Sequence, residues 1–312
     1  MTNNLPSNTS ASSVEIDFFE LFKVLSSGRW TILAVTMLVS VAVIIYAILI
    51  PNKYEAKAIL YPVSFDEAAS PNLRGYSGIA SLAGINFPSA SKESNTLKAL
   101  EKLKSLSFFE ENLMPNIFLP HLMAFKSWDK KNNTVILDNN KYDSVNNLWV
   151  RDIKPNKGLV PSSQESYSVF KSNHFKVNQD TNTGFIFISV KHQSPFIAKE
   201  WVELVVGEIN NYFRNKDKSE AEAAVAYLNN QIIKTNYSEV KSAMAQLLQQ
   251  EVKKLTLIEA NEFYILEYID KPVVMEKISE PNRSLICIIG AILGIFFGTL
   301  IVLIRHIIIE KI

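Results

Sequence analysis

Two long uncharged apolar runs near the ends of the chain constrain its fold more than any other feature. The first extends from Trp30 to Ile50, and the second from Ser284 to Ile304. At 1.5 Å per residue, a helix of about 21 residues covers the roughly 30 Å hydrocarbon core of a bilayer. We therefore predict two transmembrane helices, at residues 30–50 and 284–304.

The alternatives are a cleaved signal peptide for the first run and a buried core helix for the second. A signal peptide has its basic residues at the extreme N-terminus and a shorter apolar region that ends in small residues. Here 29 residues precede the first run, and Pro51-Asn52-Lys53 follows it. Two spans place both ends of the chain on one side of the membrane and residues 51–283 on the other. Basic residues flank the spans about equally on both sides, so the positive-inside rule does not decide the orientation.

Charge and cysteine content exclude several classes of protein. The 32 basic residues nearly balance the 31 acidic ones, so no field of one sign would hold nucleic acid. The only cysteine, Cys287, cannot form a disulfide within the chain, and no two histidines are closer than 18 residues. We therefore expect no nucleic-acid partner, no sequence-local metal site and no cofactor.

The region between the spans predicts an α+β domain, because alternating and helical apolar patterns are both present. The expected elements are a strand at Lys53–Val63, a small-residue loop at Gly75–Phe87, a helix at Ser94–Leu113, an exposed connection at Lys126–Asn147, a hairpin of strands at Tyr167–Val177 and Phe185–His192, and a final strand at Phe263–Met275. Before the first span, we expect a disordered tail up to Ser13 and an interfacial amphipathic helix at Glu15–Leu25.

A long helical pattern runs from Pro195 to about Glu262. No proline interrupts it after Pro195, and apolar residues recur at steps of three and four. It forms either one helix on the order of 100 Å long or two to three helices divided at Asn210–Asn215 and Asn229–Tyr237. Its apolar stripe, which includes Val225, Leu228 and Ile232, is too narrow to be covered by one small domain. The stripe therefore needs other copies of the chain or a hairpin mate.

No catalytic constellation stands out. The carboxylate pairs Asp66-Glu67, Glu110-Glu111 and Glu200 with Glu203 are typical of solvated surface, and neither GxSxG nor HExxH occurs. Trp128, Trp149 and Trp201 could stack on sugar rings, but apolar neighbours favour core packing for Trp149 and Trp201. We predict no catalytic residues.

Gly290, Gly294 and Gly298 form a double GxxxG pattern on one side of the second span. In lipid, small residues promote helix association because they let two backbones approach closely. Glycine is also common in transmembrane helices for no specific reason. The repeated spacing favours a packing face, either against the first span or against another copy of the chain.

Several segments, taken in order, resemble the Wzz family of polysaccharide chain-length determinants, also called polysaccharide co-polymerases. They are IDFFELF before the first span, PNKYEAKAILYP after it, SGIASLAGI, and LLQQEVKKLTLIEANEFYILEYID at the end of the long helix. Pro272 and Pro281-Asn282-Arg283 resemble the proline-rich segment that precedes the second span in that family. There, prolines often recur at every third position. Met275 and Ile278 occupy the two intermediate positions here, so this match is partial.

The resemblance implies cytoplasmic tails at 1–29 and 305–312 and a periplasmic domain at 51–283, with an α/β base and a protruding long helix. It implies a ring of protomers in the inner membrane and a non-catalytic control of O-antigen chain length together with the O-antigen polymerase. The growing polysaccharide and membrane lipids would be further contacts.

The resemblance leaves subclasses and rival classes to weigh. The kinase-bearing subclass is not expected, because about eight residues follow the second span and no GxxxxGK[ST] pattern occurs. The alternatives are a two-span periplasmic sensor or receptor, a membrane-bound glycan enzyme, and a co-polymerase for another surface polysaccharide such as capsule or enterobacterial common antigen.

Overall fold

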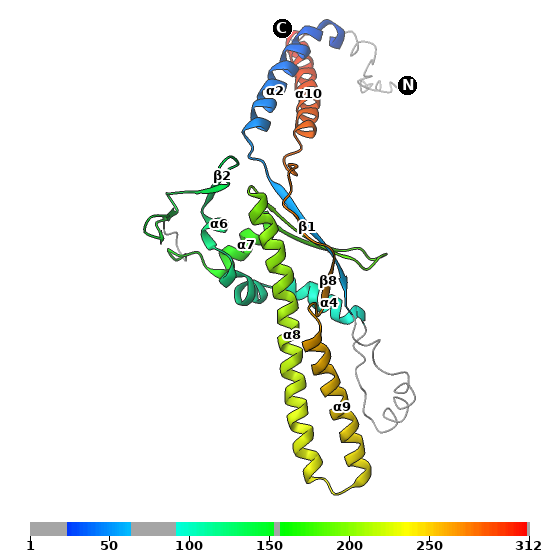
Figure 1. Cartoon of the computed structure of the whole chain (residues 1–312). Coiled ribbons are helices and arrows are strands. Elements are labelled where there is room, and N and C mark those ends of the chain that lie inside the picture. Colours follow the sequence, from blue (N-terminus) through cyan, green and yellow to red (C-terminus); the bar gives the residue numbers. More distant parts are fainter. Residues whose placement is uncertain (1–23, 64–91, 153–156, 311–312) are drawn as a thin grey trace, which may run out of the picture. The chain divides into compact units, whose positions relative to one another are not determined.

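The computed structural model describes residues 24–63, 92–152 and 157–310, and these form two units (Figure 1). One unit contains the two apolar helices, and the other is the domain Asn52–Glu280. The predicted tail up to Ser13, most of the helix at Glu15–Leu25 and the loop at Gly75–Phe87 lie outside the described residues.

The first unit is an antiparallel pair of helices, α2 (Arg29–Leu49) and α10 (Arg283–Glu310). Both are long and apolar enough to cross a membrane, and most of their side chains are exposed, which is unlike the core helix of a water-soluble domain. The two predicted apolar helices are therefore confirmed, although α10 continues beyond the predicted end at Ile304. At one end of the pair, the Arg283 Nε donates to the Ala47 carbonyl at 3.2 Å.

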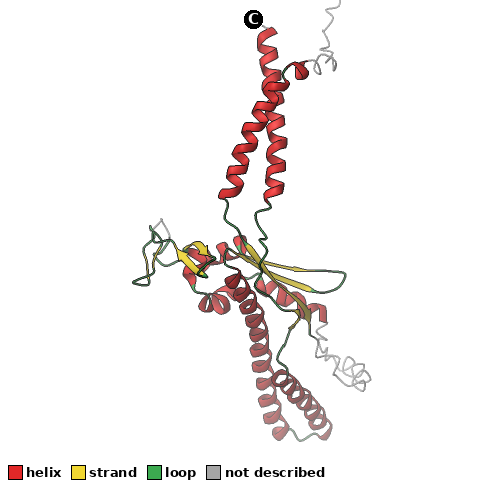
Figure 2. Ribbon diagram, turned by 45° about the horizontal axis from the view of Figure 1, so that its top comes forward, coloured by secondary structure: helices red, strands yellow, loops and turns green. Residues whose placement is uncertain are grey.

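The second unit is built on a four-stranded antiparallel sheet in the order β6-β7-β1-β8 (Figure 2). The strands are β1 (Tyr54–Pro62), β6 (Phe175–Gln179), β7 (Ile186–His192) and β8 (Leu266–Asp270). The alternating sequence of β1 places every second side chain in the core, which fixes its register with β7 from Tyr54 opposite His192 to Leu60 opposite Ile186. The first and the last strand predicted for the domain are therefore neighbours in the sheet, where β1 pairs with β8.

Shorter elements surround this sheet. They are α4 (Lys92–Leu103), α5 (Leu106–Phe108), a π-helical turn (Phe109–Leu113), a 3₁₀ turn (Met114–Asn116), α6 (Leu119–Met123), β2 (Phe125–Asp129), β3 (Thr134–Leu137), β4 (Tyr142–Asp143), β5 (Leu148–Trp149) and α7 (Ser163–Asn173). The helix expected at Ser94–Leu113 is present as α4 and α5 with the π turn, interrupted where Ser105 caps α5.

Two predictions for this region are wrong. Lys126–Asn147 is not a bare connection, since β2 pairs with β3 and β4 with β5. Asn133 and Asn147 adopt positive φ at the turns, which asparagine tolerates better than most residues. The strand expected at Tyr167–Val177 is the helix α7 up to Asn173, and only Phe175–Gln179 is strand. The Ser162 side chain accepts from the Glu165 N–H and caps α7.

The long helical pattern folds back on itself as a hairpin of α8 (Pro195–Lys234) and α9 (Ser238–Ala260), which lie side by side in Figure 1. Of the two possible breaks, the second is real: Thr235 donates through both its N–H and its hydroxyl to the Gln231 carbonyl and ends α8. Asn210–Asn215 is continuous helix. A single 65-residue helix is therefore not formed.

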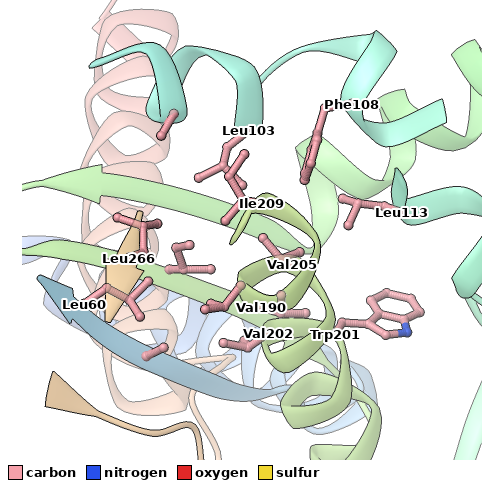
Figure 3. Packing of buried hydrophobic residues seen from close by; sticks show 14 of the residues in the cluster. Leu60, Leu103, Phe108, Leu113, Val190, Trp201, Val202, Val205, Ile209 and Leu266 are labelled. Atoms are coloured by element: carbon pink, nitrogen blue, oxygen red, sulfur yellow. The ribbon is translucent and has the colours of Figure 1, made fainter. Parts of the chain in front are cut away.

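The core of the domain lies between the sheet and the first half of α8 (Figure 3). Trp201, Val202, Val205 and Ile209 of α8 are all 2% exposed or less. Beyond Phe213, Ala221 is the only α8 residue that is buried. The outer part of α8 is thus supported by α9 and not by the sheet.

Candidate functional site

The three predicted glycines of α10 lie against α2. A Cβ added at Gly294 would stand 3.0 Å from the Thr36 Cα, and one at Gly298 would stand 3.0 Å from the Ile32 Cα. At Gly290 it would meet the Val43 side chain at 2.6 Å. The structure therefore places the GxxxG face against the first span, which was one of the two arrangements that the sequence left open.

At Gly294 and Gly298 the two backbones approach each other directly. A Cβ added at Gly294 would stand 3.2 Å from the Thr36 carbonyl oxygen, and one added at Gly298 would stand 3.1 Å from the Ile32 carbonyl oxygen. Gly28, just before α2, completes the contact from the other helix, because a Cβ there would overlap the Val302 side chain. Sequence reasoning missed Gly28, because it lies outside the apolar run and belongs to no GxxxG pattern. Close backbones maximise dispersion contacts where water supplies no driving force.

The membrane-proximal segment predicted from its prolines is held to the start of the domain. Pro272 is buried, whereas Pro281 is half-buried and Arg283 begins α10. Lys53 and Glu280 form an isolated antiparallel bridge, and the Ser279 hydroxyl donates to Glu55 at 3.0 Å. These contacts hold the first and last residues of the domain together.

Lys191 adds ion pairs to this contact between the two ends of the domain. Its Nζ lies 2.6 Å from the Glu280 carboxylate and 3.6 Å from that of Glu55. The hydrogen bond to Glu280 raises the pKa of Lys191. Partial burial would raise the pKa of Glu55, but hydrogen bonds from Ser189 and Ser279, together with the charge and hydrogen bond of Lys191, lower it. Lys191 and Glu55 are therefore both charged at neutral pH.

Asn210, predicted as a possible helix break, instead joins α8 to the returning chain. Its Oδ1 accepts from the backbone N–H groups of Tyr264, Ile265 and Leu266 at 2.8–3.1 Å. Its Nδ2 donates to the Leu266 carbonyl at 3.0 Å and to the Val206 carbonyl at 2.9 Å. Only 5% of the residue is exposed. One side chain thereby satisfies three buried backbone donors, which fixes where β8 starts.

The predicted stripe residues Val225, Leu228 and Ile232 are half-buried and share the side of α8 that carries the buried Ala221. At the domain end of the hairpin, Lys218 contacts Glu259 at 2.5 Å and the Arg214 guanidinium donates to the Asn261 carbonyl at 2.7 Å. Large apolar side chains are nevertheless exposed near the hairpin tip. They are Tyr227, Ile233, Tyr237 and Val240.

Two of the acidic residues considered for catalysis make contacts with neighbouring side chains. Glu110 accepts from the Ser163 hydroxyl at the surface, and Glu203 pairs with Lys199 at 3.0 Å. The Asp66-Glu67 pair lies outside the described residues. Within the described ranges, no group of three or more His, Cys, Asp or Glu side chains is arranged to hold a metal ion.

Trp201 is a core residue, as its neighbours predict. It packs edge-on against His192 and His174, at ring-centroid distances of 5.2 and 5.4 Å. His192 is 1% exposed, accepts from the Ser194 N–H, and has a pKa that burial lowers to about 3. Trp149 is half-buried against Tyr142, and the Trp128 indole donates to Asn133.

Two family models match this chain, and their matched ranges contain the two partners of the α2–α10 and β1–β8 contacts. A model described as "Chain length determinant protein" (Wzz) matches residues 14–111, which include α2 and β1. A second, described as "G-rich domain on putative tyrosine kinase", matches residues 236–307, which include α9, β8 and most of α10. The matched parts fold against each other, since α2 packs on α10 and β1 pairs with β8. Over residues 14–111, the chain is thus similar to the Wzz family of chain length determinants.

Two solved structures are also similar to this chain. One is described as a full-length bacterial polysaccharide co-polymerase, with 12% identity, a TM-score of 0.41, and coverage of 94% of this chain and 99% of the other. The other is a fragment of WzzB, the polysaccharide co-polymerase from Salmonella Typhimurium, with 13% identity, a TM-score of 0.30, and coverage of 74% and 100%. No curated protein sequence matches.

Proposed function

We propose that this chain is a chain length determinant for the O-antigen polysaccharide of lipopolysaccharide, and that it acts without catalysing a reaction. The observation that carries the proposal is the Wzz match over α2 and β1. In the described part of the domain, the polar groups of Asn210 and Lys191 hold elements of the fold together.

In this proposal the chain resides in the bacterial inner membrane, with α2 and α10 as its spans. Residues 51–283 lie in the periplasm, and residues 1–29 and 305–312 lie in the cytoplasm. The support is the length and lipid-exposed character of the two helices, together with the family.

The proposed working form is a ring-like homo-oligomer that contacts the O-antigen polymerase and the growing polysaccharide. Exposed Tyr227, Ile233 and Tyr237, at 63%, 81% and 73% exposure, give the outer part of the hairpin an apolar surface that a neighbouring protomer would cover. The glycine contact would hold the two spans in the geometry that the polymerase recognises.

The test is gel electrophoresis of lipopolysaccharide from a strain that lacks the gene, with the gene restored as the control. We expect the mutant to retain O-antigen polymer with a random distribution of lengths, because another protein forms the glycosidic bonds. Loss of all polymer would identify an enzyme and refute the proposal.

A second candidate is length control of a different surface polysaccharide, such as capsule. The match to the G-rich domain of putative tyrosine kinases favours it, although the 312 residues contain no GxxxxGK[ST] phosphate-binding pattern. Sizing capsular polysaccharide from the same deletion strain separates the two. An unchanged O-antigen ladder with altered capsule length would support this candidate.

A further inference from the structure

The helix pair carries a groove on its surface, separate from the glycine contact. Its volume is 470 Å³, and its lining consists of Arg29, Ile32, Leu33, Thr36 and Met37 of α2, with Ile295 of α10. The α2 residues recur at steps of three and four, so the groove follows one side of that helix. Ile295 is fixed beside it because the neighbouring Gly294 packs on Thr36.

The groove has one charged end and an apolar length. Among the described residues, Arg29 is the only charged one on the lining, and it is exposed at the first position of α2. Within the described part of the chain, its guanidinium makes no ion pair. The single hydroxyl on the lining, that of Thr36, donates to the Ile32 carbonyl at 2.8 Å. An occupant would therefore meet a cation at one end and hydrocarbon along the rest.

The length of the groove favours a lipid chain over a transmembrane helix of a partner as its occupant. From Arg29 to Met37 the helix rises about 12 Å, whereas one leaflet of the hydrocarbon core is about 15 Å deep. A transmembrane helix of a partner would need a groove along the full span of about 30 Å. A groove that starts at a helix end and stops within one leaflet fits a single lipid chain.

We propose that this groove is a binding site for an anionic phospholipid, with the phosphate on Arg29 and one acyl chain along Ile32, Thr36 and Met37. The inference rests on the bilayer placement proposed above. Basic residues at the ends of membrane helices attract acidic headgroups, and the apolar lining adds contact area for the chain.

The test is native mass spectrometry of the full-length protein in detergent, with equal amounts of phosphatidylglycerol and phosphatidylcholine. We expect the wild type to retain phosphatidylglycerol preferentially, and Arg29→Gln to lose about fivefold in that retention. Arg305→Gln is the matched control: it removes the same charge near the same end of the helix pair but does not line the groove, so it should retain the lipid. Leu33→Trp should also reduce retention, because the larger side chain fills the groove.

Equal retention of the two lipids by the wild type would overturn the proposal, as would unchanged retention in Arg29→Gln. Glycerol phosphate, the headgroup without chains, should not compete, and competition by it would refute the role of the acyl chain. Alkaline extraction of membranes tests the bilayer placement separately. Release of the protein by alkali would refute that placement, whereas a retained protein without lipid preference refutes only the groove site.

Discussion

Gly294 of α10 lies against Thr36 of α2 so closely that an added Cβ would stand 3.0 Å from the Thr36 Cα and 3.2 Å from its carbonyl oxygen. Those two atoms belong to the backbone, so they cannot turn aside as a flexible side chain can. Any side chain at residue 294 therefore has to separate the helices. The glycine spacing in the sequence becomes a testable geometric constraint on the membrane unit.

Replacing Gly294 with Leu should shorten or randomise the O-antigen distribution while the amount of protein in the membrane stays the same. Contacts between helices in lipid are worth roughly 1 kcal/mol each, so we expect a weakened helix pair and not a lost one. Lipopolysaccharide electrophoresis and immunoblotting of membranes measure the two quantities.

Two further variants sharpen this test. Ala42→Leu adds comparable volume at an exposed position of α2 and should leave the distribution unchanged. The double change Gly290→Leu with Gly294→Leu should have a larger effect than either alone. A double mutant that inserts normally and keeps the wild-type distribution would show that the glycines have no role in length control.

Asn210→Ala should destabilise the domain by about 3 kcal/mol, because it leaves the buried N–H groups of Tyr264, Ile265 and Leu266 without their acceptor. Asn229→Ala, on the exposed surface of the same helix, should change the stability little. Denaturant unfolding of the purified protein measures both. Equal stability of the two variants would contradict the role assigned to Asn210.

Acid should destabilise the domain through His192. Its pKa is about 3 in the folded protein because of burial, against about 6.5 in an unfolded chain. The contribution is therefore complete above pH 6.5 and is lost as the pH falls from 6.5 towards 3, at up to about 1.4 kcal/mol per pH unit. His192→Gln should flatten this part of the stability profile. An equally steep profile in the variant would assign the acid sensitivity to other groups.

Asp at Val225, Leu228 or Ile232 should perturb the hairpin core, the oligomer or both, because a carboxylate on a half-buried apolar side loses hydration. Ala226→Asp, which is exposed on the same helix, is the control. Light scattering in detergent should give a multimeric mass for the wild type and the control. A monomeric wild type would contradict self-assembly.

The sequence predicts the elements whose pattern is long and regular. The apolar helices α2 and α10, the alternating strand β1 and the helical stretch from Pro195 all follow from periodicity. Periodicity does not show whether that stretch is one helix or two, because the break at Thr235 comes from a side chain bonding back to Gln231. A helical pattern with a narrow apolar stripe fits a hairpin as well as an assembly of several chains.

The errors fall where a few polar side chains outweigh the apolar pattern. The region Tyr167–Asn173 has β-forming residues, which led to the prediction of a strand. Ser162 and Glu165 nevertheless form a helix-start pattern, and this pattern is present in the sequence. Asn210 gave no signal of its own, since its function depends on backbone groups more than 50 residues later. The helix-packing glycines were visible because spacing alone defines their face, whereas which helix they meet required the structure.

The most direct test of the account is the length distribution of O-antigen, measured by lipopolysaccharide electrophoresis in the deletion strain and in the strain with the gene restored. The account predicts that total polymer is retained in the deletion strain, that its lengths become random, and that the restored gene returns a preferred length. A deletion strain without polymer, or one whose distribution equals that of the wild type, would contradict it.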